Sequence, residues 1–231
     1  MLKNTIINRK ATLKIANALG DLNQEVVYVG GAMVSLYIDD QAAEDIRPTK
    51  DIDLTFEIHS HKELEGLRQQ LIERGFIQSA EDTVICRFRY DELKVDVMST
   101  QQVGWAPSNR WFAPGFAQAI DYELDGNRIR IMPLPYFLAT KIEAFFDRGI
   151  NDVYASHDLE DIVYLLNYTS SIAAQILNAD SNIKQFLADS FLRMRNNERI
   201  MIAMTGHLYY EESEARMEVI RERMNTVIDG L

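Results

Sequence analysis

The chain has 231 residues, of which 47% are hydrophobic and 26% charged, a balance that supports one or two folded domains and excludes a disordered protein. Its formal net charge of −11 argues against a general nucleic-acid binder, which needs a basic surface. The single cysteine, Cys86, excludes an internal disulfide, and no apolar run approaches the about 18 residues of a membrane span, so we expect a cytoplasmic protein without a membrane partner.

The first part of the chain alternates helix and strand patterns. Residues 9–20 carry apolar side chains at helical spacing and end at a glycine, which predicts an amphipathic helix. Residues 25–29, with the sequence EVVYV, are a short β-branched run typical of a buried strand. The run ends at Gly30 and Gly31, after which residues 32–38 return to helical periodicity. We therefore predict a strand, a tight glycine turn and a helix in succession.

Further strand patterns follow, joined by helix and turn signals. Polar and apolar side chains alternate over residues 51–58, which predicts a strand whose apolar side chains face the core. Residues 62–74 form an amphipathic helix pattern closed by a glycine. Residues 83–90 and 93–99 flank turn residues and predict an antiparallel hairpin, and residues 120–132 predict another.

The strand patterns stop at two prolines, Pro133 and Pro135, and helical patterns then continue almost to the C-terminus. We predict an α+β protein with two domains. Residues 1–135 form a catalytic domain with a mixed sheet flanked by helices, and residues 136–231 form an all-helical domain.

Three aspartates stand in the predicted strands. Asp51 and Asp53 are two residues apart and project to the same face, whereas Asp96 leaves its strand on the side opposite to its apolar neighbours. Adjacent carboxylates repel each other unless a cation lies between them, and hard oxygen ligands suit Mg²⁺ or Mn²⁺. If the two strands are neighbours, the three aspartates are both catalytic residues and metal ligands. They would hold two ions about 3.5–4 Å apart, as in phosphoryl transfer.

The glycine turn supplies the other half of this site. Gly30 and Gly31 let backbone N–H groups approach a polyphosphate, and the N-terminus of the following helix favours anions. Ser35 lies one helical turn further on as a candidate phosphate donor, and Lys50, before the Asp51 strand, is a candidate counter-charge. Taken alone, the glycine pair is better explained by a tight turn.

The ordered set of motifs resembles a known enzyme family. The segments VGGAMVSL, RPTKDIDL and KVDV are similar to the signature of polymerase-β-like nucleotidyltransferases. The segments PLPYFLATKIEAFFDRG and SHDLEDIVYLL are similar to bacterial nucleotidyltransferases grouped with the AbiEii toxins of type IV toxin–antitoxin systems, and the matches together cover residues 26–167. The resemblance implies a polymerase-β-like catalytic domain and the three aspartates as metal ligands. Many members of the wider superfamily have Gly-Ser where this chain has Gly30-Gly31.

The resemblance also implies that Lys141 contacts nucleotide phosphate. Arg148 lies seven residues further on and shares nearly the same helix face, so we include it as a nucleotide-binding residue; two solvated cations are the alternative. Asp158 and Asp161 fall at the start of a helix, where Ser156 or Asp158 is also a candidate N-cap. We assign these two aspartates a supporting role in ordering the cations.

The resemblance implies transfer of a nucleoside monophosphate from an NTP to an acceptor, with Mg²⁺ or Mn²⁺ as cofactor. The acceptor class stays open between tRNA, protein and a small molecule, and a cognate antitoxin is a candidate partner. The alternative is a catalytically silent nucleotide-binding or interaction module. A steep Mg²⁺ dependence of NTP binding distinguishes the enzyme from the silent module.

Overall fold

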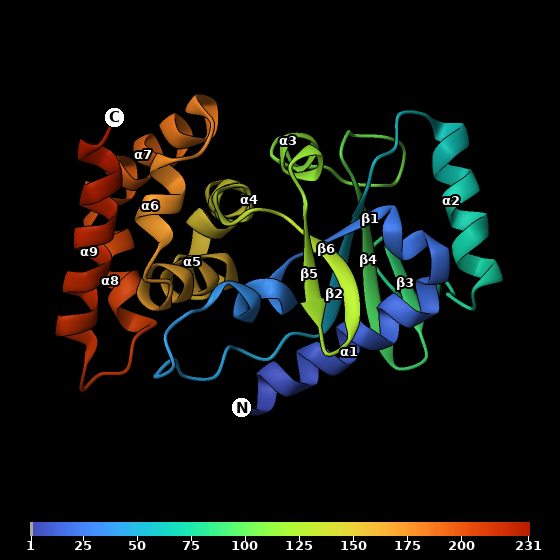
Figure 1. Ribbon diagram of the computed structural model, residues 1–231, viewed down its shortest axis with the longest axis horizontal. Coiled ribbons are helices and arrows are strands. Elements are labelled where there is room, and N and C mark those ends of the chain that lie inside the picture. The colour runs from blue at the N-terminus through green and yellow to red at the C-terminus, as the bar shows by residue number, and fades with distance from the viewer. Residues whose placement is uncertain (1) are drawn as a thin grey trace. The chain divides into compact units, whose positions relative to one another are not determined.

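The computed structural model describes residues Leu2–Leu231, which form two compact units. The first unit comprises Met1–Ser35 and Glu44–Pro133, and the second comprises Leu36–Ala43 and Leu134–Leu231. The sheet belongs to the first unit and the helices from α4 onward belong to the second (Figure 1).

Six strands of the first unit form one mixed sheet in the order β3-β4-β2-β1-β6-β5 (Figure 1). Neighbours β2 and β4 are parallel, as are β1 and β6, and the other three pairs are antiparallel. Both predicted hairpins are confirmed, although the first strand of the first one begins at Arg87 rather than at residue 83. They turn at residues with positive φ, Asp91 and Asp125-Gly126. The bounds are β1 Val26–Val29, β2 Asp51–Phe56, β3 Arg87–Tyr90, β4 Leu93–Ser99, β5 Ile120–Leu124 and β6 Asn127–Ile131.

Helices flank this sheet, so the predicted α+β class with a mixed sheet is confirmed. Helix α2 buries an apolar stripe of Leu64, Leu67 and Leu71, and its end is set by Gly75 at a φ of +88°. The α-helices of this unit are α1 Lys3–Leu19, α2 His61–Glu73 and α3 Phe112–Ala117, and the 3₁₀ helices are η1 Gly20–Gln24 and η2 Gly31–Tyr37, the last of which runs into the second unit.

Two helix predictions were wrong in detail. Helix α1 begins six residues before the predicted start because the Asp45 carboxylate accepts hydrogen bonds from the backbone N–H groups of Asn4, at 2.7 Å, and Thr5, at 3.1 Å. The segment after the glycine turn is the 3₁₀ helix η2 rather than an α-helix. Its residues 31–34 are buried consecutively, so they do not form the single apolar face that an α-helix would present.

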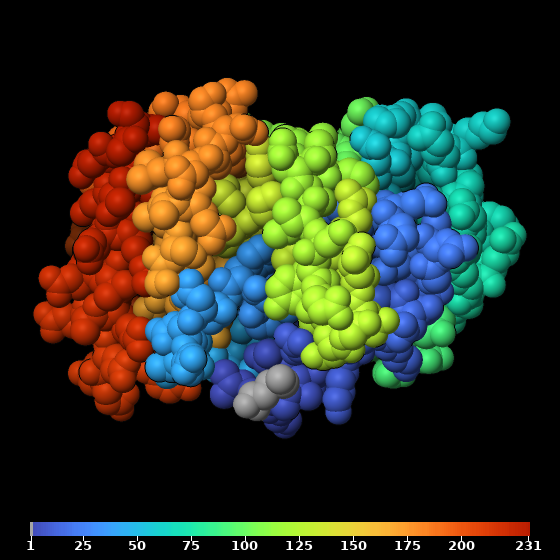
Figure 2. All heavy atoms as spheres, viewed as in Figure 1, coloured from blue at the N-terminus to red at the C-terminus, as the bar shows by residue number. Residues whose placement is uncertain are grey.

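The second unit is helical. Its elements are α4 Leu134–Asp147, η3 Gly149–Asp152, α5 His157–Tyr168, α6 Ile172–Leu177, α7 Ser181–Arg195, α8 Glu198–Gly206 and α9 Ser213–Asp229. Helix α4 is largely buried, with Phe137, Leu138, Ile142 and Phe145 fully inaccessible. Helix α9, coloured red, spreads over the surface of this unit in Figure 2. None of the helices described between Leu2 and Leu231 is long and apolar enough to cross a membrane.

The segment Leu36–Ala43 belongs to the helical unit through specific contacts. Asp39 accepts hydrogen bonds from the backbone N–H of Ser170 at 2.7 Å and from its hydroxyl at 2.9 Å. The ring of Tyr37 stacks on Phe137 with centroids 4.5 Å apart. A short stretch far upstream in the sequence therefore completes the helical unit.

Candidate active site

Asp51, Asp53 and Asp96 lie on one face of two neighbouring strands. Strands β2 and β4 are parallel, and the Cα atoms of Asp53 and Asp96 are paired across them. The intervening residues Ile52 and Val95 are buried, so the aspartates occupy the opposite face. The side chain of Asp96 is 13% exposed and that of Asp51 35% exposed. The neighbouring strands thus bring the three predicted carboxylates into one region.

Gly30 closes directly onto this region. It has a φ of +77°, and a Cβ atom added there would lie 2.8 Å from Cβ and 2.5 Å from Cγ of Asp53, and closer still to its Oδ2. Both the backbone conformation and the space therefore require glycine at this position. The turn that follows β1 lies against the Asp53 carboxylate.

Gly31 is enclosed by the segment before β2. A Cβ atom there would collide with the Arg47 guanidinium and lie 2.8 Å from Cγ2 of Thr49. Thr49 in turn donates a hydrogen bond from its hydroxyl to Oδ1 of Asn8, at 2.8 Å. Arg47 and Thr49 therefore build one wall of the glycine turn, and the sequence prediction did not include Arg47 in the candidate site.

The two other predicted phosphate contacts of the first unit differ in accessibility. The Ser35 hydroxyl is buried and has no hydrogen-bond partner among residues Leu2–Leu231. Lys50 is exposed. Lys50 can reach a ligand from solvent, whereas the Ser35 hydroxyl is shielded from solvent.

Arg87 is the second site residue that the sequence prediction missed. Its Nε donates to Oδ1 of Asp96 and its Nη2 to Oδ2, both at 2.7 Å, and Nη2 also reaches Oδ2 of Asp51 at 3.1 Å. Hydrogen bonding to Asp96 raises the pKa of the Arg87 guanidinium. The turn at Asp91-Glu92 fixes the register that pairs Arg87 with Asp96, so the hairpin pattern contained this signal.

Cys86, next to Arg87, is a buried free cysteine. Its side chain is buried, and burial together with the nearby Asp96 charge raises its pKa to about 11. The thiol is therefore protonated at neutral pH and is a poor nucleophile.

A second polar cluster lies within the helical unit. Nζ of Lys141, on α4, donates to Oδ2 of Asp161 at 2.7 Å and lies 3.9 Å from Oδ1 of Asp158, both on α5. Arg148 donates from Nε to Asp158 at 2.8 Å. The Lys141 and Asp161 side chains are 8% and 4% exposed, so this ion pair is buried, while Arg148 is largely exposed.

The structure shows which residue caps the N-terminus of α5, Ser156 or Asp158. Ser156 is the N-cap of α5, and its hydroxyl accepts a hydrogen bond from the backbone N–H of Leu159 at 3.3 Å. Asp158 is left to bind Arg148 and to lie near Lys141. The first turns of α5 thus place the carboxylates of Asp158 and Asp161 beside Lys141 and Arg148.

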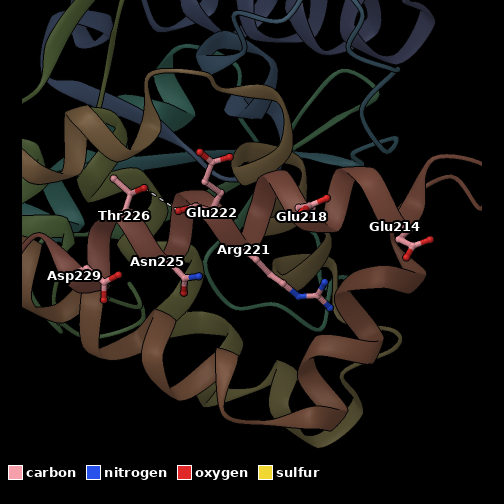
Figure 3. Close-up of a pocket in the computed structure, with 7 residues that line it drawn as sticks. All are labelled: Glu214, Glu218, Arg221, Glu222, Asn225, Thr226 and Asp229. Carbon is pink, nitrogen blue, oxygen red and sulfur yellow. Dashed lines mark hydrogen bonds between the residues drawn. The ribbon is translucent and has the colours of Figure 1, made fainter.

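A groove of about 600 Å³ runs along α9, away from either cluster in sequence (Figure 3). Its lining residues all come from this helix: Glu214, Glu218, Arg221, Glu222, Asn225, Thr226 and Asp229. Figure 3 shows them along successive turns of the helix, with the Thr226 hydroxyl donating to the Glu222 carbonyl within the helix. None of the predicted site residues lines this groove.

The carboxylates fit a divalent cation in part. Asp51 and Asp53 offer hard oxygen donors side by side on β2, the chemistry that Mg²⁺ takes from proteins. Both Asp96 oxygens, however, accept hydrogen bonds from Arg87. Within the described chain no group of three or more His, Cys, Asp or Glu side chains is arranged to hold a metal ion. Arg87 also donates to Oδ2 of Asp51 at 3.1 Å, so the complete trio does not fit a cation while Arg87 is in place.

Comparison with known proteins decides the family. A family model described as "Nucleotidyl transferase AbiEii toxin, Type IV TA system" matches residues 15–229. The chain belongs to this family. Its fold is similar to a solved structure described as an antigenic nucleotidyltransferase-like protein from Paracoccidioides brasiliensis, with a TM-score of 0.51 and 17% sequence identity, covering 85% of this chain and 92% of that one. No curated protein matches the chain.

Membership of the AbiEii family confirms the resemblance drawn from the motifs, and the match extends beyond residue 167 through the helical unit. The fold is similar to that of the solved nucleotidyltransferase-like protein. The three aspartates and the two glycines come together in the sheet unit, and the two cations and two supporting aspartates come together in the helical unit.

Proposed function

We propose that this AbiEii-family protein transfers a nucleoside monophosphate from an NTP to an acceptor hydroxyl. One observation carries the proposal. Asp51, Asp53 and Asp96 share a face of two parallel strands, and the turn at Gly30 lies directly against Asp53. Carboxylates beside a backbone turn that tolerates no side chain are suited to a polyphosphate and its counter-cation.

Asp51 and Asp53 would hold the cation, which is Mg²⁺ or Mn²⁺ by the chemistry of the donors. Bound there, the cation would neutralise triphosphate charge and polarise a phosphoryl oxygen. Asp96 was predicted to contribute to a second ion site. Because Arg87 donates to both of its oxygens, Asp96 binds an ion only in competition with Arg87.

The chain's own groups position the reactants. Backbone N–H groups at Gly30 and Gly31 hold the phosphates without hindrance from a side chain. The acceptor oxygen attacks the α-phosphorus in line, a new P–O bond forms, and pyrophosphate leaves with the electrons of the bond that breaks. Asp96 accepts the hydroxyl proton through lone pairs that Arg87 does not use. Catalysis arises mainly from positioning and charge neutralisation.

The remaining predicted nucleotide contacts belong to this proposal. Exposed Lys50 supplies positive charge to the phosphates, and Ser35 donates once uncovered. Lys141 and Arg148 retain the phosphate-binding role that the family resemblance implies. Asp158 and Asp161 keep these two cations in defined positions within the helical unit.

The acceptor is tRNA, a protein or a small molecule, and the family description supports a cognate antitoxin as partner. The net charge of −11 disfavours tRNA unless a local basic region compensates.

A catalytically silent nucleotide-binding module is the second candidate. The observation that favours it is the bidentate bond between Arg87 and Asp96, which occupies a carboxylate that the reaction needs. A silent module binds NTP with little dependence on Mg²⁺, whereas the enzyme requires the cation.

The experiment is transfer of label from each of the four α-radiolabelled NTPs, with Mg²⁺ or Mn²⁺, into total RNA, protein and small-molecule extracts. Label in one fraction that disappears with Asp51→Asn/Asp53→Asn supports the enzyme and identifies the acceptor class. NTP binding without cation dependence and without label transfer in any fraction supports the silent module.

A further inference from the structure

Arg87 makes the closest contacts to the carboxylates of the sheet. It lies on β3, directly opposite Asp96 on β4 in the antiparallel register. Its guanidinium donates to both oxygens of Asp96 at 2.7 Å and to one oxygen of Asp51 at 3.1 Å. One guanidinium therefore bridges two of the three aspartates that the proposed reaction uses.

The bridge is shielded from solvent. The side chains of Arg87 and Asp96 are 14% and 13% exposed, so water and salt screen their attraction less than at an open surface. A guanidinium stays charged at every physiological pH, and its fork of N–H groups matches a carboxylate in two parallel bonds. Arg87 is a permanent positive charge at the position where a second cation would bind Asp96.

The same strand carries a natural comparison. Arg89 lies two residues along β3, on the same face, and binds Asp82 in the same bidentate way, at 2.7 and 2.9 Å. No contact joins Arg89 to the three aspartates in the hydrogen bonds or ion pairs found for it. The chain therefore contains two similar arginine–carboxylate pairs, one inside the carboxylate cluster and one outside it.

We propose that Arg87 is a positioning residue that acts as a resident cation, holding Asp96 and limiting the wild-type protein to one tightly bound divalent ion at Asp51 and Asp53. This inference rests on the proposed function, since it assumes that these carboxylates bind a metal. A second ion gains Asp96 as a ligand only by competing with the guanidinium for its negative charge. Arg87 thereby sets how many divalent ions the cluster binds at a given concentration.

The test is Mn²⁺ titration of the full chain, with free Mn²⁺ counted from its electron paramagnetic resonance signal and no nucleotide present. Wild type is compared with Arg87→Gln, which removes the charge, and with Arg89→Gln as the matched control. We expect one ion per chain in wild type and Arg89→Gln. In Arg87→Gln we expect a second ion to bind as well. Its affinity should exceed that of any weak second ion in wild type by about tenfold or more, the scale of one charge-assisted hydrogen bond.

Arg87→Lys protects the test against loss of folding. Lysine keeps the positive charge but lacks the fork, so its Mn²⁺ affinity should fall between wild type and Arg87→Gln. Far-ultraviolet circular dichroism of each variant establishes that it is folded before titration. A merely structural role would lower the melting temperature without changing the number or affinity of bound ions.

The outcomes separate the two proposals. Equal stoichiometry and affinity in wild type, Arg87→Gln and Arg87→Lys overturn the role of Arg87 while leaving the metal site intact. Tight binding of two ions by wild type overturns it as well. No Mn²⁺ binding in any folded variant removes the metal from the proposed function, and this inference falls with it.

Discussion

Replacing Gly30 by alanine tests the packing of the glycine turn against Asp53. The φ of +77° costs an L-residue about 1–2 kcal/mol, part of which is offset by the reduced entropy of the unfolded chain. The added Cβ also meets Cβ of Asp53 at 2.8 Å, on a β-strand backbone that cannot easily retreat. Overpacking of this kind costs a further about 1–3 kcal/mol. We therefore expect Gly30→Ala to destabilise the protein by about 2–4 kcal/mol.

Gly126→Ala is the matched control. Gly126 has a φ of +87° in the β5–β6 turn, and a Cβ atom there meets nothing within 4 Å, so only the backbone cost applies, about 1 kcal/mol. Urea unfolding followed by tryptophan fluorescence reports on the sheet unit, because Trp105 and Trp111 both belong to it.

Function should separate the two glycine variants further. Displacement of Asp53 by about 1 Å should lower label transfer about a hundredfold in Gly30→Ala and leave Gly126→Ala unaffected. Equal losses of stability in the two variants, with full transfer by Gly30→Ala, would show that the contact between the turn and Asp53 is unimportant.

Three other perturbations have defined outcomes. Lys141→Met removes the cation that donates to the buried Asp161 carboxylate and should lower the free energy of urea unfolding by about 3–5 kcal/mol. The double variant Lys141→Met/Asp161→Leu should restore most of this loss. No recovery in the double variant would contradict a buried ion pair. Asp45→Ala removes the acceptor for the first amides of α1 and should lower stability by about 1 kcal/mol. The first turn of α1 should then fray, which amide hydrogen exchange measures. Unchanged protection of these amides would be inconsistent with the cap. Burial lowers the pKa of His207, so its contribution to stability is present above the unfolded pKa of 6.5 and is lost as the pH falls towards the folded pKa. His207→Gln should therefore show a smaller decline of the urea midpoint between pH 7 and pH 5 than the wild type. An identical decline in both proteins would exclude this role of His207.

Local patterns predicted the fold well where neighbouring residues decide the structure. Alternation over β2 gave its buried face, and the turns at Asp91 and Asp125-Gly126 fixed both hairpins, because positive φ is required there and the two-residue period does the rest. The start of α1 could not be predicted, because Asp45 caps it from 40 residues away.

The arrangement of the candidate site residues was predictable only in part. Spacing in β2 and β4 identified the three aspartates, but which strands are neighbours is a tertiary property, and the family resemblance supplied it. Arg87 was within reach, since the hairpin register places it opposite Asp96. Arg47 was not, because its contact with Gly31 depends on how the segment before β2 folds back, which no periodicity encodes.

The segment Leu36–Ala43 limits how gene recombination can exchange the two units of this protein. Because it interrupts the first unit and completes the second, no single crossover in the gene exchanges the helical unit whole. A recombinant that acquires a new sequence from Leu134 onward keeps the old Asp39 facing a new residue at position 170. Asp39 and Ser170 should therefore vary together among relatives, and the two units should share one ancestry rather than two.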